Sequence, residues 1–157
     1  MDVKETLIAG SQGALENVIR AIRAMPEDKL QWKPLDMGRS AMEQFQEVAQ
    51  SPLWAVGLLK TMKFELDPER MEKMRAEREA WTTVDQCEKA ARENAELLFD
   101  SIRSFPSEDM GKTIHLPFRG GMDMTVLQIM SLMVWNCNYH EGQICYIQTL
   151  YGDKDMH

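Results

Sequence analysis

One face of a single helical segment constrains the fold of this chain more than any other feature of the sequence. Apolar residues recur along this segment three, four or seven residues apart: Met133, Cys137, Ile144, Ile147 and Tyr151. His140 occupies the step between positions 137 and 144. Because these spacings place side chains on one side of an α-helix, the pattern predicts a core-facing helix. Thr125 can cap its start and Gly152 can follow its end, so we expect the helix over about residues 125 to 150.

Three further segments carry the same period. The first is expected over residues 3–24. The second opens at Ser40, where Glu43 three residues later completes a capping box, and extends to about residue 62. Pro52 lies inside this second segment and predicts a kink, not a break, because the apolar repeat continues on both sides of it. The third is expected over residues 83–105, where its apolar positions again follow the helical period.

The connections between these segments are longer than those of a simple up-and-down bundle. Residues 67–80 are dense in charge and predict a solvated, short helix in a crossover. Residues 112–124 carry a Gly120–Gly121 turn between two apolar patches and predict a small hairpin-like connection. The chain is therefore expected to be all-α, a four-helix bundle with long crossover connections that forms one domain over residues 1–157. The side chains expected to be mostly buried in its core are Phe45, Leu98, Met133 and Ile144.

Charge and composition exclude several classes of partner. The net charge of −7 disfavours nucleic acid, whose binding depends on clustered lysine and arginine, and it equally disfavours anionic membranes. No apolar run approaches the roughly 20 residues that span a bilayer, and the first residues do not resemble a secretory signal. The three cysteines are odd in number and lack CxxC spacing, so neither a disulfide framework nor a thiolate zinc site is expected. These features predict a cytoplasmic protein.

A polar group interrupts the apolar ladder of the last helix. His140 lies there with Asn136 four residues before it and Gln143 three residues after it, so the three side chains share one side of the helix. Polar side chains in a core-facing stripe are unfavourable unless they are paired. Two interpretations account for them. One is a buried histidine satisfied by hydrogen bonds, and the other is a metal or substrate site inside the bundle.

The order of short motifs along the whole chain resembles that of the DinB-like (DinB/YfiT) superfamily. The motifs are Trp32-Lys33-Pro34, a helix opening at Ser40, Gln50-Ser51-x-x-Trp54, a helix capped by Thr125, His140-x-Gly142-Gln143-Ile144 and a terminal Leu150-x-Gly152. This resemblance implies a four-helix bundle, often dimeric, with a divalent metal near one end. Three histidines hold that metal in the family, one from the second helix and two, four residues apart, from the fourth. Some relatives are thiol-dependent S-transferases or isomerases.

Carried over position by position, the three family histidines fall on Glu47, Asn136 and His140, with Gln143 in the adjoining pocket. The resemblance thus implies zinc or nickel as the metal and these three residues as its ligands. Glutamate is a sound ligand for such ions. An asparagine amide oxygen suits harder cations better. In the competing account there is no metal: Glu47 and His140 pair directly, and Asn136 bridges them by hydrogen bonds.

Two functions follow from these alternatives. The first is divalent-metal-dependent transferase or hydrolase-type chemistry on a small molecule, with a low-molecular-weight thiol as cosubstrate, in which the metal polarises the thiol or a carbonyl. The second is a non-enzymatic module for small-molecule binding or stress response with a degenerate, metal-free site. In both cases the ligand is a small molecule. A homodimer with a two-fold interface is expected as well, because the apolar stripes are longer than one core requires.

Overall fold

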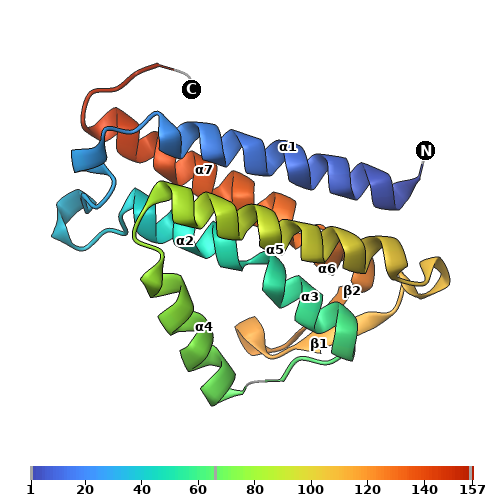
Figure 1. The fold of residues 1–157 in the computed structure, drawn as a ribbon. Helices are drawn as coiled ribbons and strands as arrows, with labels where there is room; N and C mark the ends of the chain where they lie inside the picture. The colour runs from blue at the N-terminus through green and yellow to red at the C-terminus, as the bar shows by residue number, and fades with distance from the viewer. Residues whose placement is uncertain (1, 66, 156) are drawn as a thin grey trace.

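The computed structural model describes residues 2–65, 67–155 and 157, and within them four long helical segments form a bundle (Figure 1). The segments are α1 (Val3–Arg23), α2 with α3 (Ala41–Gln50 and Pro52–Thr61), α5 (Val84–Ser104), and α6 with α7 (Val126–Met130 and Leu132–Leu150). Outside the bundle lie α4 (Pro68–Ala80) and the strands β1 (Thr113–Leu116) and β2 (Met122–Thr125). Short 3₁₀ turns occupy Glu27–Lys29, Pro34–Asp36, Ser107–Asp109 and Phe118–Gly120.

The four segments enclose one core. α1 packs mainly against α7 and α5, α5 packs against α2 and α3, and α2 packs against α7. The four side chains expected to be mostly buried are each at most 2% exposed: Phe45, Leu98, Met133 and Ile144. The prediction of an all-α four-helix bundle with long crossovers is therefore confirmed. No helix among the described residues is long and apolar enough to cross a membrane.

Local hydrogen bonds define where several helices begin. Paired side chains form reciprocal capping boxes at the starts of α2, α5 and α6, made by Ser40 with Glu43, Thr83 with Gln86 and Thr125 with Gln128. Each box satisfies backbone N–H groups that the first turn of a helix leaves without partners. The caps predicted at Ser40 and Thr125 are confirmed.

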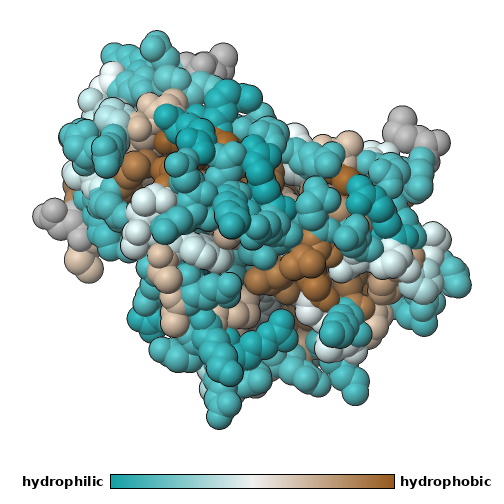
Figure 2. Space-filling view, viewed as in Figure 1, coloured by the Kyte–Doolittle hydropathy of each residue, from teal (hydrophilic) through white to brown (hydrophobic). Residues whose placement is uncertain are grey.

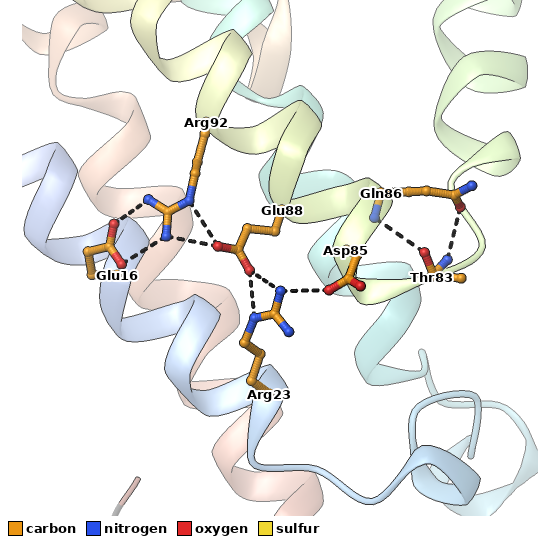
Figure 3. A network of polar contacts seen from close by, with 7 residues as sticks. All are labelled: Glu16, Arg23, Thr83, Asp85, Gln86, Glu88 and Arg92. Carbon is orange, nitrogen blue, oxygen red and sulfur yellow. Dashed lines mark hydrogen bonds and ion pairs between the residues drawn. The ribbon is translucent and has the colours of Figure 1, made fainter.

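A network of charged side chains ties α1 to α5 on the outside of the bundle (Figure 3). Arg23 of α1 bonds to Asp85 at 2.7 Å and to Glu88 at 2.5 Å, both on α5. Arg92 of α5 bonds to the same Glu88 at 2.9 Å and to Glu16 of α1. A single surface ion pair contributes about 0–1 kcal/mol. Because Glu88 is shared by both arginines, these pairs form one continuous network along the contact between α1 and α5.

Pro52 produces the expected kink and separates α2 from α3. Ser51, at the joint, keeps helical backbone angles (φ −55°, ψ −34°). Proline has no N–H to offer the carbonyl four residues earlier, and the Ser51 hydroxyl donates to that Val48 carbonyl instead, at 3.1 Å.

The buried face of α2 continues into α3. Ala55, Leu58 and Leu59 enter the core there, whereas Leu53 and Val56 are half-buried. The buried positions therefore keep one helical period across Pro52, because Phe45, Val48, Pro52, Ala55 and Leu59 follow one another at steps of three and four.

The last helical segment is interrupted once, which the apolar ladder did not predict. α6 ends at Ser131 (φ −86°, ψ −5°), whose N–H bonds to the carbonyls of Leu127 and Gln128 in a tightened turn. The Ser131 hydroxyl donates to the Gln128 carbonyl at 2.7 Å. Short bonds of this kind tighten a helix without ending it, so the chain continues directly into α7.

The charged crossover forms a helix within the range expected for it, α4, which stands away from the bundle as a separate arm (Figure 1). None of the residues described in α4 is buried, and its visible surface is mostly hydrophilic (Figure 2). Two side chains of α2 hold it: Gln46 donates to the Trp81 carbonyl at 2.8 Å and Gln50 to the Met74 carbonyl at 2.5 Å. The arm is therefore positioned by hydrogen bonds to its backbone.

The predicted hairpin-like connection is confirmed. β1 and β2 pair antiparallel, with Ile114 opposite Met124. Gly120 and Gly121, which precede β2, both have positive φ, at 87° and 98°, where other residues are strained. Ile114 and Leu116 fix the hairpin to the bundle because both side chains are buried.

The homodimer expected from the sequence stays a prediction, and the outer side of α7 is the face on which we expect it. Trp135, Tyr139, Tyr146 and Leu150 are exposed there, and the first two rings stack at 5.3 Å. Sedimentation velocity at micromolar concentrations should show a dimer that Tyr146→Lys weakens, while the control Leu97→Lys, at an exposed apolar position on α5, leaves it intact. A wild-type monomer throughout this range would contradict the prediction.

Candidate functional site

His140 lies in the middle of α7, and its imidazole is only 1% exposed. Nε2 lies 3.1 Å from Glu47 Oε1 on α2, and Nδ1 lies 2.9 Å from Gln143 Oε1 and 3.3 Å from Gln44 Oε1. The ring is held between two helices because α7 packs on α2, where Gln44 and Glu47 lie one turn apart. Each ring nitrogen therefore has at least one side-chain oxygen within hydrogen-bond distance.

Glu47 connects this buried ring to solvent. Its side chain is 36% exposed, and its second oxygen, Oε2, lies 2.7 Å from Arg39 Nη2. The hydrogen bond to His140 is the main cause that lowers the pKa of Glu47 to about 2, against the opposing effect of burial and with a smaller contribution from Arg39. At neutral pH Glu47 is therefore an ionised anchor with both oxygens engaged, and it is a weak base.

Asn136 lies one turn before His140 but does not bridge it to Glu47. Among the described residues, Asn136 Oδ1 is buried without a hydrogen-bond partner. The bridge expected in the metal-free account is therefore absent.

Glu47, Asn136 and His140 do not fit a resident zinc or nickel ion. Within the described part of the chain, no group of three or more His, Cys, Asp or Glu side chains could hold a metal. Both ring nitrogens of His140 already lie within hydrogen-bond distance of side-chain oxygens, Nε2 of Glu47 and Nδ1 of Gln143. The third donor is an amide oxygen, a poor ligand for these ions. The residues present instead form a self-sufficient ion pair.

A groove of about 840 Å³ opens beside the pair, between the bundle and the arm α4. Glu47 and Asn136 contribute polar atoms to its wall, and its apolar lining consists of Trp54, Met71, Met74, Phe118, Leu132 and Trp135. Gln143, expected in the pocket, does not line this groove and serves as a partner of the histidine ring.

The far wall of the groove is made by segments that the sequence placed outside the bundle. Phe118, in the turn before β2, approaches Trp54 with ring centroids 6.3 Å apart, and Phe64 lies between them at 5.7 Å and 5.0 Å. Sequence reasoning missed these aromatic side chains and the whole contribution of α4. It also missed Gln44 and Arg39, although Gln44 lies three residues before Glu47, a spacing that places both on one side of a helix.

Comparison with known proteins agrees with this architecture. The family model described as the DinB superfamily matches residues 12–144. YfiT from Bacillus subtilis, described as a probable metal-dependent hydrolase with an unusual four-helix bundle topology, superposes with a TM-score of 0.73 at 14% identity, covering 95% of this chain and 87% of that one. A DinB-like protein from Bacillus subtilis, YjoA, gives 0.66 at 12% identity, covering 97% and 96%. A search of curated proteins finds no match.

Proposed function

We propose that this chain, which belongs to the DinB superfamily, binds an apolar small molecule in the groove beside Glu47 and does so without a resident metal ion. The observation that carries the proposal is the closed Glu47–His140 pair at the edge of that groove. The pair satisfies its own charges and hydrogen bonds, so it supports the wall of a binding site without needing an ion to complete it.

The groove has the character of a ligand site. Known small-molecule pockets have volumes of about 300–1,000 Å³ and are mostly apolar, with a few polar groups that orient the ligand. The groove here has about 840 Å³ and is lined by aromatic and methionine side chains. Methionine adapts its shape to different apolar ligands. Asn136, a lining residue of the groove, carries a side-chain oxygen that has no hydrogen-bond partner among the described residues.

Metal-dependent transferase or hydrolase-type chemistry, the other function considered from the sequence, has less support here. YfiT is described as a probable metal-dependent hydrolase. Such chemistry needs ligands that leave a coordination position open for water or substrate. Here His140 is buried and bonded to Glu47, and the pKa of Glu47, about 2, makes it a weak base near neutral pH. We therefore infer a binding module.

A neutral fluorescent probe tests this function. N-phenyl-1-naphthylamine should bind the wild type saturably, with enhanced fluorescence that neither EDTA nor zinc changes. Met71→Glu places a charge in the groove, so it should weaken binding at least about tenfold. The matched control Ala76→Glu adds the same charge to an exposed position of α4 outside the groove and should bind like the wild type. Absence of saturable binding, or equal weakening by both variants, would refute the proposal.

A further inference from the structure

One cation in the groove has no counter-charge. Arg78 lies in the last turn of α4, half-buried, and lines the groove. Among the side chains that the structure describes, none forms an ion pair or hydrogen bond with its guanidinium. Arg75, one turn earlier on the same helix and in the same groove wall, pairs with Glu79 at 2.8 Å. The two arginines therefore share a location and differ in whether their charge is satisfied.

The other charges of the groove do not compensate Arg78. Glu47 is already paired with Arg39 and His140. Glu72, an exposed residue at the groove, lies close enough to Arg75 to raise the pKa of that arginine, although Glu79 has the larger effect. Arg78 is thus a cation of the groove lining without an ion-pair partner among the described side chains, on a protein whose net charge is −7.

The position of Arg78 is set by the hydrogen bonds that hold the arm. Gln50 binds the Met74 carbonyl and Gln46 binds the Trp81 carbonyl, so the stretch of chain that contains Arg78 is fixed against α2. Met71, in the apolar lining, lies seven residues earlier on α4, which is about 10 Å along the helix axis. One side of the groove therefore presents a guanidinium and, about 10 Å away, an apolar surface.

We propose that the groove selects an amphipathic carboxylate, with the carboxylate on Arg78 and the apolar body directed along α4 toward Met71 and Phe118. This inference rests on the proposed binding function and names its ligand class. A guanidinium presents paired N–H donors in the plane that a carboxylate accepts, and desolvation inside a groove strengthens that contact. A medium-chain acid has the length to reach from the charge to the aromatic lining.

Three ligands of equal chain length test this selection on the full chain. Isothermal titration calorimetry with decanoate, 1-decanol and decylamine should show decanoate binding at least about tenfold more tightly than the other two, the factor expected of a charge-assisted hydrogen bond. Arg78→Gln should remove that preference while leaving the affinity for 1-decanol unchanged. The matched control Arg75→Gln should keep it, because its guanidinium is already paired.

Each contrary result has a distinct meaning. Decylamine binding as tightly as decanoate, or an unchanged decanoate affinity in Arg78→Gln, overturns the carboxylate selection. If 1-decanol still binds, and Met71→Glu weakens it, groove binding stands while the ligand class is wrong. Failure of all three ligands and of N-phenyl-1-naphthylamine to bind overturns the proposed function together with this inference.

Discussion

Replacing Asn136 with histidine is expected to create a zinc or nickel site where the wild type has none. The variant places two imidazoles four residues apart on α7, facing Glu47 on α2. Two histidines and one glutamate match the ligands of known catalytic zinc sites. Calorimetry should detect no zinc binding by the wild type and binding at least about 100-fold tighter by Asn136→His. At a zinc concentration 100 times the Kd, unfolding should be opposed by about 2.7 kcal/mol more.

Two controls separate a built site from adventitious binding. Asn138→His adds a histidine to the exposed side of the same helix and should gain nothing. Asn136→His combined with His140→Gln should lose the gain, because one imidazole is removed again. Tight zinc binding by the wild type would contradict the metal-free proposal. No binding by Asn136→His would mean that Glu47 is not the position from which α2 supplies a ligand.

Removing the buried imidazole should have the second large effect. His140→Ala leaves a cavity in the contact between α2 and α7 and strips three oxygens of their donor. Large-to-small substitutions at buried sites cost about 2–5 kcal/mol, so we expect the free energy of unfolding to fall by about 3 kcal/mol. Urea unfolding followed by circular dichroism measures it. The control His115→Ala removes an exposed histidine paired with Asp123 and should cost less than about 0.5 kcal/mol.

The same pair should make stability depend on acidity. The pKa of Glu47 is lowered from 4.5 to about 2 in the folded protein, so its stabilising contribution is complete above pH 4.5 and is lost as the pH falls toward 2. Because the side chain is 36% exposed, solvent screening reduces that contribution to about 1–2 kcal/mol. The difference in unfolding free energy between wild type and Glu47→Gln should therefore shrink over this range. A difference that stays constant from pH 5 to pH 2.5 would contradict the expectation.

The fold could be predicted because the period of the apolar residues shows which side of each helix faces the core. Met133, Cys137, Ile144 and Ile147 all lie in the core, as their spacing predicted. The interruption at Ser131 escaped prediction because a tightened turn preserves the direction of the helix and shifts the apolar pattern only slightly. Pro52 was recognised as a kink, and the buried positions on its two sides keep the same helical period, as predicted.

The candidate site was predictable only in part. The juxtaposition of Glu47 and His140 followed from the family resemblance. The sequence did not predict the groove beside them, since its far wall comes from α4 and from the turn that holds Phe118. Those segments carry no helical apolar stripe, so their position relative to the bundle depends on a few long-range contacts. Arg39 and Gln44 complete the environment of the pair and were missed as well, although Gln44 lies on α2 three residues before Glu47.

The way α4 is attached has a consequence for how fast a molecule can enter and leave. No described side chain of the arm belongs to the core, so swinging it outward breaks the bonds from Gln46 and Gln50 and leaves the bundle folded. Openings of this kind need far less free energy than global unfolding and occur on microsecond to millisecond timescales. Residence time in the groove would then be governed by these two glutamines, of which only Gln50 lines the groove, while the apolar lining determines what is bound.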